Sequence, residues 1–303
     1  MNVASAPGKV VAVLDGAPAI SLAVNRRAAA RVDRIDADEH ELHVNGTCEP
    51  GDFALFDAVL KYVLPDSTNR FRATLDTADF AHDGTKLGIG SSAALAAALT
   101  AALAPSGTRA EWLERAGAAH RKFQGGIGSG VDVATSCVGG LVLYRAGGEL
   151  PQSLRWPDGL YFAVLWSGIP ASTPDRLRAL KTQSNGGARQ KLAAEAESAA
   201  GAWSSGDVQA ILEATGRYTD VLRSFSDSQR LDVFGAGHGE LVNAGAPGTV
   251  YKPCGAGGGD VGMVLGTSDA AIASFVESAE ARGFTRLDIG RDDRGVTLHE
   301  QEQ

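Results

Sequence analysis

Residues 84–98 read Gly-Thr-Lys-Leu-Gly-Ile-Gly-Ser-Ser-Ala-Ala-Leu-Ala-Ala-Ala, and this stretch decides the fold. Its Ala/Leu run is apolar on almost every side, which predicts a buried central helix from Ser92 to Leu103. The start of a helix leaves backbone N–H groups unpaired and carries a partial positive charge, so it suits a bound anion. Gly88 and Gly90 would let the backbone approach a phosphate closely, and the two serines can cap the helix or reach a metal ion. Taken alone, the stretch is also consistent with an ordinary helix cap.

The composition indicates a soluble globular protein rather than a disordered one. The chain has 303 residues, 44% of them hydrophobic, which is enough for two cores of about 150 residues each. No apolar run approaches the roughly 20 residues that cross a bilayer, and the net charge of −8 disfavours binding to nucleic acid. Cys48, Cys137 and Cys254 are scattered without CxxC spacing, which indicates reduced thiols in a cytoplasm rather than zinc or disulfides. We therefore expect a cytoplasmic protein without a membrane segment, and the sequence leaves a homodimer open.

The order of the predicted elements indicates an α+β fold rather than a regular βαβ series. The predicted strands are residues 2–14, 19–32, 40–46, 70–76, 139–148, 161–168, 248–252, 261–265, 284–289 and 294–298, the last two as a pair. The predicted helices, besides the central one, are residues 53–63, 108–123, 187–203, 207–225 and 268–282, with a further helix start at Ser172–Asp175. In the helix at 108–123 we expect Phe123 on the buried face. The polar loop around residues 147–159 places the domain boundary, giving domains 1–155 and 156–303.

Three glycine-containing motifs, numbered in chain order, together strengthen the case for a phosphate ligand. The first motif is Ala6-Pro7-Gly8-Lys9, where a short turn could present the lysine ammonium to a phosphate or a carboxylate. The second motif is Gly-Ile-Gly-Ser-Ser at 88–92. The third motif, residues 255–262, has five glycines in eight residues, which is typical of a backbone that approaches a ligand closely. A solvated turn lysine and a mobile hairpin are the structural alternatives for the first and third motifs.

Together, the three motifs resemble those of the GHMP small-molecule kinase family, in the same order and with similar spacing from about residue 4 to 266. The resemblance implies a two-domain GHMP kinase fold, with an N-terminal domain like ribosomal protein S5 domain 2 and a ferredoxin-like C-terminal domain. It also implies that ATP lies between the domains, with Mg²⁺ held by Ser92. The residues that it places at the nucleotide are Lys86, Gly88, Gly90, Ser91, Ser92 and Ala93.

A fourth stretch, residues 124–134, resembles the phosphomevalonate kinase branch of this family. Lys86 ahead of the second motif, residues 168–177 and residues 24–28 resemble the same branch. The resemblance implies ATP-dependent phosphorylation of 5-phosphomevalonate to mevalonate 5-diphosphate in the mevalonate pathway of isoprenoid synthesis. Galactokinases carry a sugar-binding signature that is missing here, and the Ser/Arg-rich signature of diphosphomevalonate decarboxylases is also missing.

The resemblance assigns Asp132 and Lys9 as catalytic residues, with the aspartate facing the acceptor. Because the second pKa of a phosphate monoester is about 6, this acceptor is already ionised at neutral pH. We therefore expect Asp132 to orient and stabilise rather than to act mainly as a base, and a capping aspartate is the structural alternative. The residues implied at the acceptor are Ser129, Gly130, Ser172, Gly257, Gly258 and Gly259.

Other polar residues are candidates for the site. The reserve cations for a doubly charged acceptor are Arg26, Arg27, Lys122, Lys181 and Lys252, most of them expected on the solvated surface. His120 and Gln124 lie about one helical turn apart and would face the glycine loops, although a structural hydrogen bond explains His120 equally well. Cys254 is expected to be a packing residue.

The chain departs from the family after the first motif. Lys9 is followed by Val-Val-Ala-Val-Leu-Asp-Gly-Ala-Pro, a shorter segment that lacks the family's Gly-Glu-Tyr. Two alternatives therefore stay open. One is a kinase for mevalonate or another small hydroxy-acid alcohol, and the other is a catalytically weak protein that binds nucleotide and metabolite.

Overall fold

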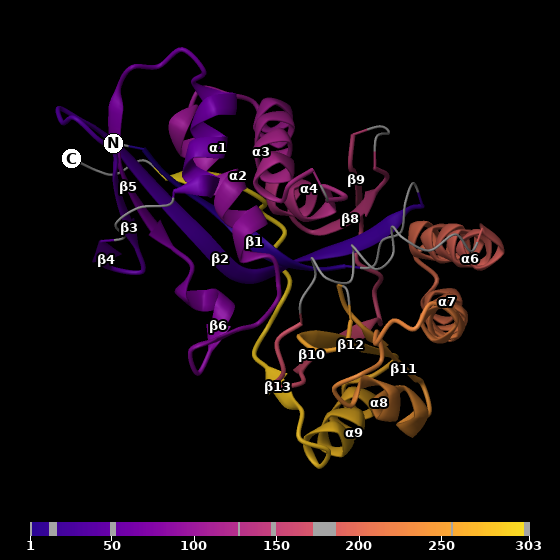
Figure 1. Cartoon of the computed structure of the whole chain (residues 1–303). Coiled ribbons are helices and arrows are strands. Elements are labelled where there is room, and N and C mark those ends of the chain that lie inside the picture. Colours follow the sequence, from indigo (N-terminus) through magenta and orange to yellow (C-terminus); the bar gives the residue numbers. More distant parts are fainter. Residues whose placement is uncertain are drawn as a thin grey trace.

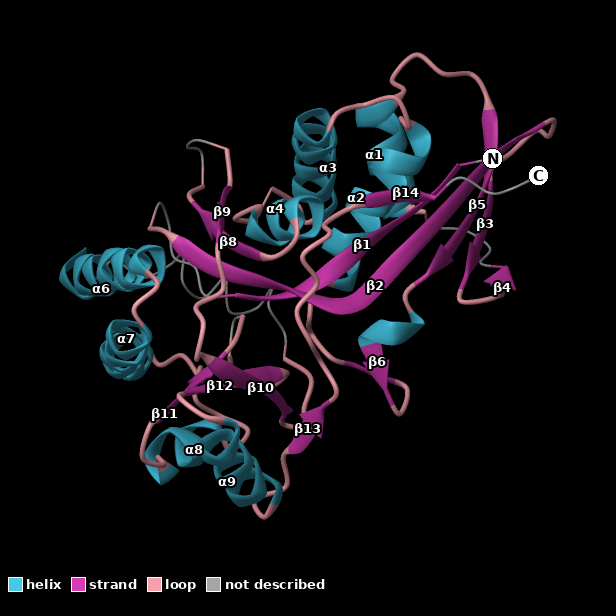
Figure 2. Ribbon diagram, turned by 180° about the vertical axis from the view of Figure 1, so that it is seen from behind, coloured by secondary structure: helices cyan, strands magenta, loops and turns pink. Residues whose placement is uncertain are grey.

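The computed structural model of the chain describes residues 2–11, 17–48, 53–126, 128–146, 150–171, 186–255 and 257–299, with side chains from residue 17 onward. Over these residues the chain forms two main, antiparallel-rich sheets, each with its own set of helices, and one small two-stranded sheet (Figure 1). Helices α1 to α4 cover one face of the larger sheet, and the smaller sheet with α8 and α9 lies beyond its other face (Figure 2). The predicted α+β fold is confirmed.

The larger sheet is built around the 17-residue strand β2 (Ala19–Ile35). It pairs with β1 (Asn2–Val11) along one edge, and with β5 (Arg70–Asp76) and β8 (Leu141–Tyr144) along the other. In β5, buried and exposed side chains alternate as its sequence predicts. The remaining strands of this sheet are β3 (Glu41–Val44), β4 (Thr47–Cys48), β9 (Gln152–Leu154) and β14 (Thr297–His299).

The helices of the first half pack on the larger sheet. They are α1 (Ala54–Val63), α2 (Ser91–Leu103), α3 (Arg109–Phe123) and α4 (Val131–Val138). Every α2 residue from Ala93 to Leu103 is buried, so the predicted central helix is confirmed. Helix α3 begins with a capping box between Thr108 and Glu111. The expectation of a buried Phe123 is wrong, because the helix ends there and the ring is 42% exposed beyond the last packed turn.

The smaller sheet has the order β11-β12-β10-β13. Its strands are β10 (Tyr161–Trp166), β11 (Thr249–Pro253), β12 (Val261–Gly266) and β13 (Thr285–Leu287). The helices of this half are α6 (Gly186–Ser205), α7 (Val208–Ser228), α8 (His238–Ala244) and α9 (Asp269–Glu280). Between β5 and α2 lie a short 3₁₀ turn, η1 (Ala78–Phe80), and a small hairpin of β6 (Ala81–His82) and β7 (Thr85–Lys86).

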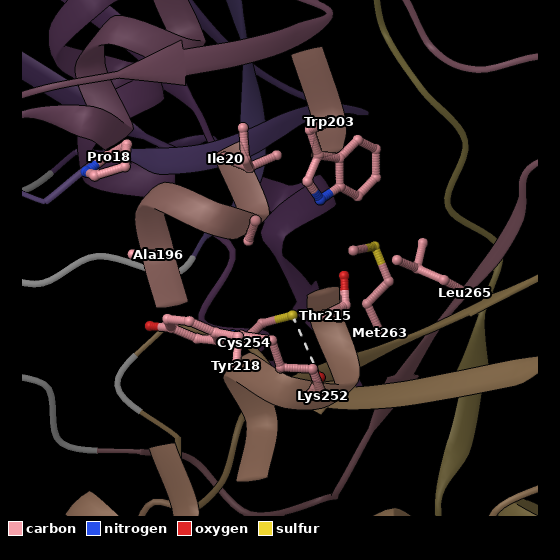
Figure 3. A pocket seen from close by; sticks show the side chains of 11 residues that line it. Pro18, Ile20, Ala196, Trp203, Thr215, Tyr218, Lys252, Cys254, Met263 and Leu265 are labelled. Carbon is pink, nitrogen blue, oxygen red and sulfur yellow. Dashed lines mark hydrogen bonds between the residues drawn. The ribbon is translucent and has the colours of Figure 1, made fainter. Parts of the chain in front are cut away.

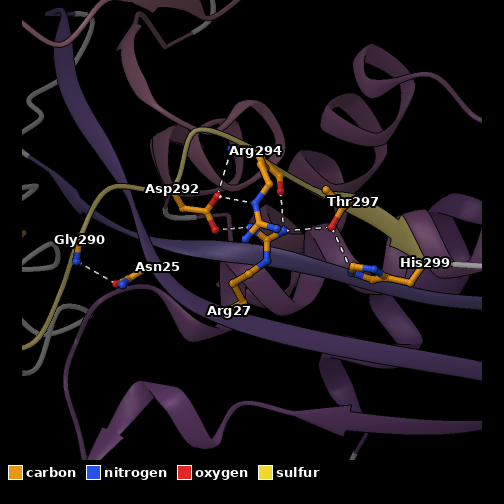
Figure 4. Close-up of polar contacts among 8 residues, drawn as sticks. Asn25, Arg27, Gly290, Asp292, Arg294, Thr297 and His299 are labelled. Atoms are coloured by element: carbon orange, nitrogen blue, oxygen red, sulfur yellow. Dashed lines mark hydrogen bonds and ion pairs between the residues drawn. The ribbon is translucent and has the colours of Figure 1, made fainter.

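The last two predicted strands lie in different sheets. The strand predicted at 284–289 contains β13, which pairs with β10 in the smaller sheet, and the strand predicted at 294–298 overlaps β14, which pairs with β1 in the larger one. The segment between them therefore crosses from one sheet to the other. It is held there by Asn25, whose side chain accepts from the Gly290 amide at 2.9 Å, and by Arg27, which contacts Asp292 (Figure 4).

Some predictions fall on residues that the structure does not describe, and others are not tested by it. Residues 12–14 and the helix start at Ser172 lie outside the described residues. The division of the chain at residue 155 stays a prediction. In the described part of the chain, no helix has both the length and the apolar character that a membrane span requires.

Candidate active site

The start of α2 has the geometry that the second motif predicts. Gly88 and Gly90 both adopt positive φ angles, 70° and 86°, which favour glycine. Gly90 is the N-cap residue, and no side chain caps the first turn. The N–H groups at the start of α2 are thus left without a side-chain cap, as an anion site requires. Lys86 is exposed in β7, two residues ahead of this loop.

Asp260 brings the second and third motifs together. An added Cβ on Gly88 would overlap the Asp260 carboxylate, so a side chain at position 88 would displace one loop from the other. The Asp260 Oδ1 atom accepts from the Ala171 amide at 2.9 Å, and its own amide donates to the Ile169 carbonyl at 2.7 Å. Asp260 therefore joins both glycine loops to the segment after β10. The sequence reasoning named its glycine neighbours but not Asp260 itself.

The glycines of the third motif lie against protein. A Cβ on Gly257 would strike the Val233 carbonyl, and one on Gly259 would crowd the Ile169 carbonyl. The fully buried His238 lies between Tyr251 and this loop, with 3.1 Å from its Nε2 atom to the Gly259 carbonyl and 2.7 Å from Nδ1 to the Tyr251 hydroxyl. Because a carbonyl only accepts, His238 donates from Nε2 and accepts at Nδ1. These contacts fix the loop, and the substrate roles of Gly257, Gly258 and Gly259 stay predictions.

His120 contacts the second motif directly. Its Nε2 atom lies 3.0 Å from the Ser92 hydroxyl, and the ring is only 3% exposed. The expected orientation of His120 toward the glycine loop is therefore confirmed. Gln124, one turn further on, lies close to Gly128 in the loop that leads to α4.

The start of α4 carries Ser129, Gly130 and Asp132. Gly130 is the N-cap with φ 82°, and Asp132 follows in the first turn of the helix. The Tyr144 hydroxyl donates to the Ser129 carbonyl at 2.8 Å. Burial raises the pKa of Tyr144, the charge of Arg121 lowers it, and the charge of Asp132 raises it further, for a raised pKa overall. Arg121 is thus a cation close to the start of α4 that the sequence reasoning missed.

The short turn predicted at the first motif is wrong, because residues 6–9 lie within strand β1, with a register shift between Pro7 and Gly8. The Lys9 backbone pairs with Ala23 of β2, while its side chain is outside the described part of the structure. Ser172 lies outside the described residues, as does Lys181 among the reserve cations.

Hydrogen bonds within the protein hold the Arg27 side chain. Its guanidinium donates to Asp292 Oδ2 at 2.5 Å, to the Gly295 carbonyl at 2.6 Å and to the Thr297 hydroxyl at 3.2 Å (Figure 4). Burial raises the pKa of Asp292, but hydrogen bonds from Arg27 and from the Arg294 amide outweigh it, so the pKa is lowered overall. Arg27 is neither a surface charge nor a free cation, because these contacts hold the crossing segment.

The other reserve cations that the structure describes have different surroundings from those of Arg27. Lys122 is exposed on α3, and Arg26 donates to the Asp288 carbonyl at 3.1 Å. Lys252 lines a cavity of about 80 Å³ between the start of β2, helices α6 and α7, and strands β11 and β12 (Figure 3). Cys254, also on this cavity, is 5% exposed, so its predicted packing role is confirmed.

Comparison with known proteins shows which family this chain resembles. Residues 82–140 match the family model described as GHMP kinases N terminal domain. A phosphomevalonate kinase from Streptomyces sp. (strain CL190) is 29% identical, over 88% of this chain and 90% of its own length. The structure of phosphomevalonate kinase from Streptococcus pneumoniae, in complex with phosphomevalonate and AMPPNP, has a TM-score of 0.82 at 18% identity, covering 96% of this chain and all of that one. The Lin0012 protein from Listeria innocua has a TM-score of 0.83 at 19% identity, covering 99% of this chain and 100% of that one.

Residues 82–140 match the N-terminal domain of GHMP kinases, and the chain has the fold of GHMP kinases, as its three motifs predict. Within that class, its resemblance to phosphomevalonate kinase is confirmed, because a phosphomevalonate kinase is similar in both sequence and structure.

Proposed function

We propose that this protein transfers a phosphoryl group from ATP to the phosphate of 5-phosphomevalonate, giving mevalonate 5-diphosphate and ADP. The observation that carries the proposal is the contact between Gly88 and Asp260, because it joins the start of α2 and the third motif into one site. The choice of acceptor rests on the relatives, which are named as phosphomevalonate kinases, one of them in complex with phosphomevalonate and AMPPNP. We place the activity in the cytoplasm because the three cysteines are scattered along the chain without CxxC spacing.

The triphosphate would lie on the uncapped first turn of α2, with the exposed Lys86 reaching its oxygens. Phosphoryl transfer depends on positioning and on neutralised charge, which backbone N–H groups and cations supply. The proposed ligands of the nucleotide are Lys86, Gly88, Gly90, Ser91, Ser92 and Ala93.

Mg²⁺ fits this site with a small share of protein ligands. The described residues contain no group of three or more His, Cys, Asp or Glu side chains that could hold a metal. Ser92 offers one hydroxyl oxygen, which suits an ion that keeps most of its ligands from phosphates and water. When bound, Mg²⁺ would offset the charge that gathers on the transferred phosphoryl group.

Asp132 and Lys9 are the proposed catalytic pair. Asp132 lies in the first turn of α4, and its charge raises the pKa of Tyr144, so the carboxylate lies close to the Ser129–Gly130 turn. There it would hold the Lys9 ammonium and orient the acceptor. The acceptor oxygen needs little deprotonation, since the second pKa of a phosphate monoester is about 6.

Coupled ADP release tests the proposal, with 5-phosphomevalonate, mevalonate and homoserine offered in parallel. We expect turnover with 5-phosphomevalonate and a new diphosphate signal pair in ³¹P NMR. Turnover with mevalonate or homoserine alone would overturn the choice of acceptor in favour of a kinase for an alcohol.

Variants separate a kinase from a catalytically weak binding protein. Asp132→Asn should lower kcat by about 10²–10³-fold and leave the pH profile governed by the acceptor phosphate. Asp158→Asn is the matched control, because Asp158 is 86% exposed and pairs only with the surface residue Arg155 among the described side chains. If the wild type binds ATP yet turns over no faster than Asp132→Asn, the protein is a nucleotide-binding protein and not this kinase.

A further inference from the structure

The last turn of α3 lies between the starts of α2 and α4, and the three helices pack against one another (Figure 1). In this turn, the Nε2 atom of His120 lies 3.0 Å from the Ser92 hydroxyl in the first turn of α2. Arg121 is the next residue, and successive side chains of an α-helix point about 100° apart. The turn that contacts the proposed nucleotide site through His120 therefore directs Arg121 toward a different neighbour.

The neighbour of Arg121 is the Ser129–Gly130 turn at the start of α4. A Cβ added to Gly130 would lie 3.9 Å from the Nη2 atom of Arg121 and 2.8 Å from the Tyr144 hydroxyl. The same hydroxyl donates to the Ser129 carbonyl at 2.8 Å, which holds the turn against the end of β8. The guanidinium and the phenol hydroxyl thus lie together at this turn, where a glycine leaves room for both.

The guanidinium of Arg121 lies close to the charge of Asp132 but does not pair with it. Burial raises the pKa of Tyr144, the charge of Arg121 lowers it and the charge of Asp132 raises it, so both charges lie near the same hydroxyl. Among the described residues, no carboxylate forms an ion pair with Arg121. Because Arg121 is also exposed, its N–H groups are open to a ligand.

A phosphate is the ligand that these surroundings fit best. A guanidinium is planar and presents parallel N–H donors that match two oxygens of a phosphate. A doubly charged acceptor phosphate that approaches Asp132 is repelled by its carboxylate, and a cation beside both groups offsets this repulsion. The phosphate is also the reacting end of the acceptor, so it must lie close to the start of α2, which the same turn of α3 contacts.

We propose that Arg121 binds the phosphate of the acceptor at the start of α4, beside Asp132, and so selects a phosphorylated acceptor over the parent alcohol. The proposal rests on the function proposed above and names the residue that separates the two classes of acceptor. Arg121 is here an acceptor-binding residue, and Tyr144 holds the turn against which it lies.

Steady-state kinetics of Arg121→Met give the first test. We expect the KM for 5-phosphomevalonate to rise by about 10-fold or more, because charge-assisted hydrogen bonds are lost, while the KM for ATP changes little. Arg121→Lys keeps the charge but not the parallel donors, so it should raise the same KM by a smaller factor. Arg34→Met removes an equal charge from an exposed position near the far end of β2 and should change neither KM.

An unchanged acceptor KM in Arg121→Met, or an equal rise in the KM for ATP, would overturn the assignment. If the wild type transfers no phosphate to 5-phosphomevalonate, the proposed function fails; if it does and Arg121→Met keeps the wild-type KM, only the role of Arg121 fails.

Competitive inhibition by mevalonate shows which end of the acceptor Arg121 contacts. Mevalonate has the carboxylate but lacks the phosphate, so its inhibition constant should be the same in Arg121→Met as in the wild type. The ratio of this constant to the KM for 5-phosphomevalonate should therefore fall by about 10-fold or more in the variant. If mevalonate and 5-phosphomevalonate are weakened by the same factor, Arg121 does not bind the phosphate and the proposal is contradicted.

Discussion

Arg27 and Lys252 were both expected among the reserve cations, and their surroundings are opposite. Arg27 meets an acidic partner and two further oxygen acceptors, with a 2.5 Å ion pair to Asp292. Lys252 meets one carbonyl, one aromatic ring and an apolar cavity. A cation whose hydrogen bonds are satisfied within the protein serves the fold. Lys252 is buried without an acidic partner among the described residues, so it does not hold two segments together as Arg27 does.

The largest expected effect is on Arg27. Arg27→Met leaves the Asp292 carboxylate, 4% exposed, without its main partner, and should lower the free energy of unfolding by about 3 kcal/mol. Urea denaturation measures this. Arg31→Met is the control, since Arg31 and Asp33 form a more exposed pair that should contribute less than about 1 kcal/mol. Equal losses from both variants would mean that burial of the pair does not matter.

The lowered pKa of Asp292 gives the pH dependence of the same contact. A carboxyl group with a lowered folded-state pKa stabilises the protein above its unfolded pKa of about 4, and this contribution is lost as pH falls through the folded value. We therefore expect the Tm of the wild type to fall more steeply than that of Asp292→Asn as the solution is acidified below about pH 5. Parallel curves for the two proteins would show that Asp292 has the same pKa in both states.

Gly88 and Gly84 give a second comparison, between a glycine that lies against another loop and a glycine with open space around it. Gly88→Ala and Gly84→Ala both place a side chain at positive φ, 70° and 74°, which costs about 1 kcal/mol each. Only at Gly88 does the added Cβ meet another loop, the one that carries Asp260. Gly88→Ala should therefore weaken binding of AMPPNP by about 10-fold more than Gly84→Ala, measured by calorimetric titration. Similar binding by both variants would separate the Gly88–Asp260 contact from the nucleotide site.

The smallest expected effect is on the stability of Lys252→Met. Replacing an unpaired buried cation with an apolar side chain of similar length should leave the free energy of unfolding within about 1 kcal/mol of the wild type or raise it. Because the folded-state pKa is lowered, the penalty for burying the charge is present at neutral pH and is relieved as pH rises toward about 10. Urea denaturation across this range should show the advantage of Lys252→Met shrinking. If Lys252→Met lowered the free energy of unfolding as much as Arg27→Met, Lys252 would have a structural role like that of Arg27.

Elements with strong local patterns could be predicted from the sequence, and elements fixed by distant partners could not. The apolar run of α2 and the alternation of β5 were predicted closely. The seven-residue helix α8 has no pattern of its own and was not predicted. A strand was predicted close to β14, but its partner is β1, at the opposite end of the chain, and no local signal could indicate that pairing.

The same division holds for the site. The glycine motifs and His120 were found because their residue types are informative where they stand. Asp260 was missed because its role depends on Gly88, and the structural role of Arg27 depends on Asp292, 265 residues further along the chain. Charge alone placed Arg27 and Lys252 in one group, and only the packing distinguishes them.

A crystal structure with AMPPNP and 5-phosphomevalonate tests the central claim most directly. We expect triphosphate oxygens at the first turn of α2 and the acceptor phosphate between them and Asp132. An α2 start covered by protein with the nucleotide bound elsewhere would contradict the account.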